Sequence, residues 1–413
     1  MPDLLIWIIS LASIFCVLIR PREIAEAWWA CGGALLLALL ALISPAQAGS
    51  AMLKGVDVYL FLTGMMILSE LAREEGVFDW VAEVAASHAA GSPKRLFVLI
   101  YLAGAVVTVF LSNDATAVVL TPAVLTIVRR LKVESVPHLL ACALIANAAS
   151  FVLPISNPAN LVIYGRNMPP LVRWLGTFSI ASAVSILITF FALYFVSRKD
   201  LRGEITEKLS RTHLSTEGRL ALAGLILAAL ALITASALGW PLGAPTCASA
   251  FVAAGLVTLR NHGIPLKIVK GVSWSVIPLV AGLFVIVEAM QAAGALRLAV
   301  EGLRWAQQRH SMLGDVVTGF SVGLLSNGMN NLPVGLIGGT AVQAAHAQGS
   351  IAGAVLIGVD LGPNLSVTGS LATILWLIAL RRENVKITAP QFFKAGLIVM
   401  PTALLASLLA ARR

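Results

Sequence analysis

The sequence is poor in charged residues. Only 12% of its 413 residues are Asp, Glu, Lys or Arg, whereas 58% are hydrophobic, and the mean hydropathy is +0.90. Soluble domains carry about 25% charged residues, so this composition excludes an ordinary water-soluble protein. Apolar runs of about 20 residues, the length at which a helix crosses a bilayer, recur along the chain. The sequence therefore predicts an all-α polytopic membrane protein.

Motifs of enzyme chemistry are also lacking. The sequence contains no Walker A lysine motif and no HExxH pair. Its four cysteines, Cys16, Cys31, Cys142 and Cys247, are too far apart for the usual metal or disulfide spacings. We therefore expect no ATP hydrolysis by this chain, no resident metal and no cofactor. An intramembrane enzyme stays only as a remote alternative.

The net charge of +9 does not indicate nucleic acid as a partner. The basic residues form short clusters between apolar runs, as the positive-inside rule expects of cytoplasmic loops. Placing these clusters in the cytoplasm predicts that both termini are periplasmic. Arg297, Arg304 and Arg309 are exceptions, and they fall in a predicted amphipathic helix at the membrane interface.

About ten transmembrane helices are predicted from the apolar runs. They cover residues 3–20, 23–44, 56–74, 137–165, 171–196, 218–238, 243–259, 271–291, 350–379 and 388–410. Two further apolar segments, 95–130 and 312–346, begin and end on one side of the membrane. Each is shorter than the roughly 40 residues plus a turn that two crossings need, so each is predicted to be a re-entrant hairpin.

Two parts of the chain share one order of features. "VYLFLTGMMILSELAREEGVF" at 58–78 aligns with "VIPLVAGLFVIVEAMQAAGAL" at 276–296, which places Gly64 on Gly282. In both parts an amphipathic helix, a re-entrant hairpin and an interrupted span follow. The first aligned span runs outside to inside and the second inside to outside, which predicts the inverted repeats typical of secondary transporters.

The predicted organisation has five parts. They are an N-terminal two-helix segment (1–55), a first repeat (56–196), a cytoplasmic loop (197–217), linking helices (218–270) and a second repeat (271–413).

Polar residues interrupt the apolar chain at four places. The hairpin tips are "FLSNDATAVVLTP" at 110–122 and "LLSNGMNNLPVGL" at 324–336, and the broken spans contain "VLPISNPANLVIYG" at 152–165 and "DLGPNLSVTGSLATILW" at 360–376. Capping of helix ends explains one or two polar residues at a tip, and a lone proline would only kink a span. Several amide and hydroxyl groups with proline and glycine fit better with unwound backbone that lines a cavity.

These interruptions supply the predicted substrate-binding residues. Neutral amides and hydroxyls both donate and accept hydrogen bonds, so they suit a neutral polyhydroxylated solute or a cation held by oxygen atoms. The residues are Ser112, Asn113, Thr116, Ser156, Asn157, Asn160, Ser326, Asn327, Asn330, Asn331, Asn364, Thr368 and Ser370.

Two carboxylates within the apolar segments are candidates for proton coupling. Asp114 lies at the first hairpin tip and Asp360 lies in the second broken span. Burial favours the neutral, protonated form of a carboxyl group, which suits proton exchange. Alternatively, Asp114 caps a helix and Asp360 is paired or hydrated. Glu70 and Glu288, at equivalent repeat positions, are expected at the interfaces.

The interruptions resemble a known family. "FLSNDATAVVLTP", "SNGMNNLPVGLIGG" and "DLGPNLSVTGSLATILWL", in this order, are similar to motifs of the ArsB arsenite/antimonite efflux family in the ion-transporter superfamily. The resemblance implies efflux of As(OH)3 or Sb(OH)3 across a bacterial inner membrane, driven by proton entry. It also implies a cytosolic ArsA-type ATPase as a partner. Some members of the family have an acid where this sequence has Asn147.

Alternatives to arsenite/antimonite efflux stay open at this stage. Within the superfamily these are a sodium/proton antiporter and a sodium-coupled anion transporter, and sodium dependence would distinguish them. A passive channel is a remote alternative that uptake against a gradient would exclude.

Overall fold

The computed structural model describes residues 2–205, 207, 213–260, 263–309, 312–347 and 349–411. Parts of the predicted loop 197–217 and of the segment 218–270 therefore lie outside the described residues. Within the described ranges every regular element is a helix, and the fold is that of an all-α protein with broken helices. The predicted fold class is confirmed.

Most of the predicted spans are single helices. Six helices in the described ranges are long and apolar enough to cross a membrane, and α3 (Pro45–Lys54) with α4 (Val56–Glu74) makes a seventh, bent by 48°. The six are α1 (Pro2–Ile19), α6 (Pro93–Phe110), α11 (Leu171–Ser197), α12 (Thr216–Ala237), the pair α14 (Ile264–Gly271) with α15 (Val276–Ala292), and α21 (Ala389–Ala410). Shorter apolar helices include α2 (Glu26–Leu39) and α13 (Gly243–Thr258).

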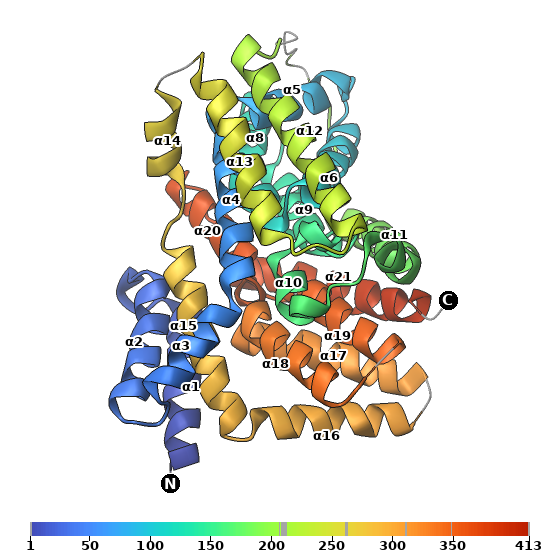
Figure 1. The fold of residues 1–413 in the computed structure, drawn as a ribbon. Coiled ribbons are helices and arrows are strands. Elements are labelled where there is room, and N and C mark those ends of the chain that lie inside the picture. Colours follow the sequence, from blue (N-terminus) through green and yellow to red (C-terminus); the bar gives the residue numbers. More distant parts are fainter. Residues whose placement is uncertain are drawn as a thin grey trace.

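The order of elements is the same in the two halves of the chain. In the first half α4 is followed by α5 (Val77–His88), a hairpin, a broken span and α11; in the second, α15 is followed by α16 (Ala295–Gln308), a hairpin, a broken span and α21. The order also pairs α1, α2 and α3 with α12, α13 and α14, outside the repeat boundaries expected from the sequence. Figure 1 shows α4 beside α13, and α2 and α3 beside α15.

Two equivalent glycines allow these helix pairs to approach closely. A Cβ atom on Gly64 of α4 would overlap the α13 backbone at Thr246, and one on Gly282 of α15 would overlap the α2 backbone at Ala30. Small residues at such contacts let membrane helices pack backbone to backbone. The glycine alignment found in the sequence therefore corresponds to one packing arrangement used twice.

Both hairpins turn inside the protein. In the first, α6 ends at Phe110, and the returning arm consists of α7 (Asn113–Ala115), a π-helical turn (Thr116–Leu120) and α8 (Thr121–Arg130). In the second, α17 (Met312–Met329) and α18 (Asn331–Ala344) are separated by Asn330 alone. The second turn comes later than the aligned "SN" pair suggests, because Ser326 and Asn327 still belong to α17.

The two broken spans unwind where the sequence is richest in proline and amides. The first consists of α9 (Ser135–Ala148), a 3-10 turn (Pro154–Ser156) and α10 (Pro158–Tyr164). The second consists of α19 (Ser350–Leu361), two 3-10 turns (Gly362–Asn364 and Val367–Gly369) and α20 (Leu371–Arg382). Proline supports these breaks because it removes a backbone donor and clashes with the preceding turn.

Helix α16 lies across one end of the molecule, at the lower edge of Figure 1 and far from α14. It buries Ala295, Leu303 and Ala306 and leaves Leu298 and Trp305 exposed. An exposed apolar edge next to basic residues is typical of a helix that lies in the membrane interface.

Candidate functional site

Groups from all four polar interruptions meet around one small cavity. Its volume is about 10 Å³, roughly the space that one water molecule requires. Its polar and charged lining residues are Asn113 and Asp114 from the first hairpin tip, Asn157 from the first break and Asn331 from the second tip. The apolar lining residues are Leu371 and Ala372 from the second broken span, together with Leu62, Pro158 and Leu332. The cavity therefore joins segments that lie far apart in the sequence.

The Asn113 amide has an unused acceptor. Its side chain is 2% exposed, and its Oδ1 atom is buried without a hydrogen-bond partner among the described residues. A buried polar atom without a partner costs about 1–3 kcal/mol. Such an atom in a cavity wall fits an acceptor that awaits a donor from a bound molecule.

Asn157 connects the first break to the second broken span. Its Nδ2 donates to Asp360 Oδ1 at 2.7 Å, and its Oδ1 accepts from the Ala159 N–H at 2.9 Å, which caps α10. Asp360 is completely buried, and its Oδ2 has no hydrogen-bond partner within the described ranges. The nearby Ser150 hydroxyl donates to a backbone carbonyl at 2.7 Å instead.

A second amide contact between the two breaks involves Asn147. Its Nδ2 donates to Asn364 Oδ1 at 3.0 Å, and Asn364 Nδ2 donates to the Leu144 carbonyl at 3.1 Å. The Ser370 hydroxyl also donates to Asn147 Oδ1, at 3.4 Å. Asn147 was noted in the sequence only as a departure from a family pattern; an amide in the apolar second half of α9 was the available signal for this role.

Asn327 fixes α17 to the second break. Its Nδ2 donates to the carbonyls of Gly323 at 2.7 Å and Gly362 at 2.9 Å. Its Oδ1 accepts from the Ser366 N–H at 3.0 Å and from the Ser366 hydroxyl at 2.6 Å. Thr368 donates to the Asn327 carbonyl at 3.0 Å. The side chain of Asn327 is thus fully engaged by its own helix and the second break, and Ser366 is a contact that sequence reasoning missed.

Other predicted site residues cap the helices that begin at the interruptions. Ser112 Oγ accepts from the Ala115 N–H at 3.2 Å, Asn330 Oδ1 from the Leu332 N–H at 3.2 Å, and Ser370 Oγ from the Thr373 N–H at 3.2 Å. Asn330 has a φ of 71° and a ψ of 150°, a backbone region that residues other than glycine rarely adopt, so the turn holds it in a strained conformation. These caps satisfy N–H groups that hydrocarbon could not.

The remaining predicted residues join neighbouring backbone. Ser156 donates to the Val109 carbonyl at 3.0 Å, linking the first break to the first hairpin. Asn160 donates to the Ser150 carbonyl at 2.9 Å. Thr116 pairs with Thr108 across the hairpin at 2.8 Å, and Ser326 donates to the Val322 carbonyl in its own helix at 3.0 Å. These four residues do not line the small cavity.

A larger hollow, of about 70 Å³, lies next to the small cavity, and we call it the vestibule. Leu62, Asp114 and Leu371 line both spaces, so Asp114 stands between them. The far part of the vestibule is lined by Glu70 near the end of α4 and by Gly271 and Ser273 between α14 and α15.

The polarity of both spaces limits what they can bind. Their lining residues in the described structure include carboxylates, amides and hydroxyls but no Lys, Arg or His. A multiply charged anion would lose hydration without finding an opposite charge. Neutral solutes with hydroxyl groups and cations that prefer oxygen ligands are the classes that fit.

Comparison with known proteins agrees with a transport site. A family model described as "Citrate transporter" matches residues 5–361. The arsenical pump membrane protein of Escherichia coli strain K12 is 29% identical over 418 residues, covering 97% of this chain and 96% of that protein. A putative arsenical pump membrane protein of Bacillus subtilis strain 168 is 23% identical, with 94% of each chain covered.

A solved structure shares the fold. The crystal structure of the Alcanivorax borkumensis YdaH transporter, described as having an unusual topology, matches with a TM-score of 0.57 at 14% identity, covering 100% of this chain and 97% of that chain.

Proposed function

The chain belongs to the citrate transporter family, and from this membership we propose that it is a secondary transporter that exports arsenite and antimonite in exchange for protons. It is a multi-pass membrane protein. The cargo is the neutral trihydroxide, the membrane is a bacterial inner membrane, and both termini are on the periplasmic side. The E. coli relative is named an arsenical pump membrane protein and the B. subtilis relative a putative one, which supports the choice of arsenic.

One observation carries the choice of a neutral cargo: Asn113, whose Oδ1 is buried without a partner among the described residues, lines the small cavity together with two other amides. As(OH)3 carries three hydroxyl donors and no charge at neutral pH. One hydroxyl would donate to Asn113 Oδ1, and the side chains of Asn157 and Asn331 lie in the same wall. At about 10 Å³ the cavity is smaller than the trihydroxide, so its walls must move apart to admit this cargo.

Asp114 is the proposed proton carrier because it lies in the walls of both the cavity and the vestibule. Protonation of Asp114 would remove the negative charge that faces the cargo and add a hydrogen-bond donor in its place. Asp360 is the second candidate, since protonation would weaken Oδ1 as the acceptor of the 2.7 Å hydrogen bond that Asn157 donates. Loading of the site by the cargo and loading by the proton would then exclude each other, as antiport requires.

Alternating access is part of this proposal. The vestibule leads from Asp114 toward Glu70, at the end of the molecule that carries α14, which the charge pattern assigns to the cytoplasm. On the α16 side, Gln291 of α15 donates to Thr340 of α18 at 3.1 Å, which supports a closed outer side. The described state is therefore assigned as inward-facing.

Everted membrane vesicles from a host without its own arsenite exporter test the function. Arsenite uptake should follow an outward-directed proton gradient, with the vesicle lumen acidic, and collapse when a protonophore removes it. Asp114→Asn should abolish the response to the gradient, whereas retained coupling in both Asp114→Asn and Asp360→Asn would disprove the assignment of the carrier.

A sodium-coupled or sodium/proton mode of the same fold is the second candidate. Asp114, Asp360 and the neighbouring amide oxygens are hard ligands of the kind that cations prefer. Proteoliposomes with an imposed sodium gradient and no proton gradient decide between the modes. A cytosolic ArsA-type ATPase is included as a partner because the resemblance implies one, and uptake without added ATPase shows whether the chain transports alone.

A further inference from the structure

The mouth of the vestibule is lined by an acidic residue. Glu70 and Asp114 are the charged residues in its described lining, and the remaining wall is apolar except for Ser69, Ser112 and Ser273. Glu70 is only 7% exposed, although it lies near the end of α4. Any solute that reaches Asp114 by this route passes the Glu70 carboxylate.

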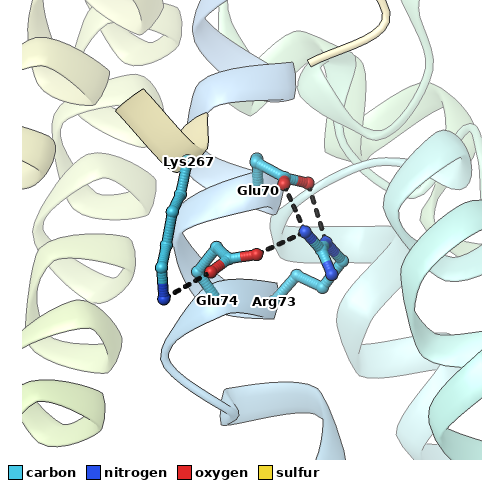
Figure 2. Close-up of polar contacts among 4 residues, drawn as sticks. All are labelled: Glu70, Arg73, Glu74 and Lys267. Carbon is cyan, nitrogen blue, oxygen red and sulfur yellow. Dashed lines mark hydrogen bonds and ion pairs between the residues drawn. The ribbon is translucent and has the colours of Figure 1, made fainter. Parts of the chain in front are cut away.

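A bidentate contact holds the Glu70 side chain in place. Arg73 Nε donates to Glu70 Oε2 at 2.9 Å and Arg73 Nη2 donates to Glu70 Oε1 at 2.6 Å. The same guanidinium contacts Glu74 at 2.5 Å, and Glu74 lies 3.2 Å from Lys267 Nζ of α14. Figure 2 shows this chain of four residues. Paired Arg–carboxylate contacts of this kind fix geometry as well as charge.

The wall opposite Glu70 has room for this carboxylate because residue 271 is glycine. A Cβ atom on Gly271 would overlap Glu70 Oε1 and the carboxylate carbon. Gly271 ends α14, in the sequence Lys-Gly-Val that also stands between α3 and α4. The equivalent Glu288 of α15 is instead paired with Lys54 from the other half, at 2.7 Å. Only the Glu70 side of this pseudo-symmetric pair borders the vestibule.

We propose that Glu70 is a specificity-determining residue, a fixed negative charge at the vestibule mouth that repels oxyanions and admits neutral trihydroxides. Arg73 is outside the vestibule lining, so it offsets only part of the Glu70 charge that the passing solute meets. The cytoplasm offers phosphate and other oxyanions to the same opening, and the cargo must be selected from among them. The role in arsenite selection rests on the proposed function, but the electrostatic filter does not.

A cysteine at the mouth measures the filter without any transport. Ser273 is exposed and lines the vestibule, so Ser273→Cys provides a site for charged methanethiosulfonate reagents. The readout is the ratio of modification rates with a cationic and an anionic reagent, followed by mass spectrometry of the peptide that contains residue 273. For one charge removed at a distance on the order of 7 Å in water, Glu70→Gln should lower this ratio roughly sevenfold.

Two further variants keep the test decisive. Glu74→Gln removes the same charge from the same network but outside the vestibule lining, and it should change the ratio by less than about twofold. Arg73→Gln leaves the Glu70 charge without its partner and should raise the ratio. An unchanged ratio in Glu70→Gln, or equal effects of Glu70→Gln and Glu74→Gln, would overturn the filter.

Transport measurements test the selectivity itself. Inorganic phosphate added to everted vesicles faces the cytoplasmic opening, and it should inhibit arsenite uptake roughly fivefold more strongly in Glu70→Gln than in the parent. If Glu70→Gln lowers the ratio of modification rates with the cationic and anionic reagents but phosphate does not inhibit its uptake more strongly, Glu70 does not determine specificity. If the parent protein moves no arsenite, the proposed function fails, while the cysteine measurement still decides whether the mouth repels anions.

Discussion

Asn327 and Asn331 stand four residues apart at the second hairpin tip, and the structure predicts different consequences of losing each. Asn327→Ala removes four hydrogen bonds, and it leaves the Gly362 carbonyl and the Ser366 N–H without their partners. Each buried group left unsatisfied costs about 1–3 kcal/mol. Because Ser366 is only partly buried, we expect a loss of about 2–4 kcal/mol in the free energy of unfolding.

Asn331→Ala should have the opposite profile. Its side chain lines the cavity and makes no hydrogen bond within the described residues. Truncation should therefore change the free energy of unfolding by less than about 1 kcal/mol, typical of a site without a structural partner. Arsenite uptake, however, should fall at least tenfold if this amide holds the cargo, since a lost hydrogen bond to a bound group is worth about 1.4 kcal/mol or more.

Thermal unfolding of the purified variants in detergent, together with vesicle uptake, separates the two roles. Gly328→Ala is the matched control, because this neighbouring position is exposed and a Cβ atom there meets nothing. An unfolding temperature of Asn327→Ala equal to that of the control would refute the assigned structural role. Normal uptake by Asn331→Ala would refute the assignment of the cavity.

Three other outcomes follow from the contacts. Gly64→Ala should destabilise the protein by about 1–3 kcal/mol because its Cβ overlaps the α13 backbone, whereas Gly32→Ala in α2 meets nothing and should be neutral by the same thermal assay. Asn157→Ala should cost about 1.5–3 kcal/mol, since it removes the donor to the buried Asp360, and much of that cost should vanish in the Asp360→Asn background in a double-mutant cycle. Glu288→Gln breaks a half-exposed ion pair and should shift stability by less than 1 kcal/mol; a larger shift in salt-dependent unfolding would show a buried role.

The spans and the first hairpin could be predicted because their signals are local. Apolar length places α4 and α11 within a residue or two, and Ser112 marks the first turn as a helix cap. The second turn could not be placed from the same signal. Ser326 and Asn327 donate to the carbonyls of Val322 and Gly323 in the preceding turn, so they extend α17 although the aligned Ser112 and Asn113 begin a helix.

The hydrogen-bond partners of the polar groups could not be predicted from the sequence. The pairs Asn157–Asp360 and Asn147–Asn364 depend on how the two broken spans cross, and no periodicity records that crossing. The alignment of Asp114 with Gly328 suggested unequal tips. If the two turns are aligned by their helix-capping residues instead, Ser112 corresponds to Asn330 and Asp114 to Leu332. In this alignment too, only the first of the two tips has an acidic residue at the compared position.

The amide contact between the two breaks also constrains how the protein can be made. Asn147 and Asn364 are separated by 217 positions. At about 5–20 residues per second, the ribosome needs roughly 10–40 s to supply the second amide after the first. During that interval the first broken span holds a polar group in the membrane whose eventual partner does not yet exist. Biosynthesis must therefore keep the first half hydrated or shielded until the second half arrives, and slow translation of the second half should expose the nascent chain to membrane proteases.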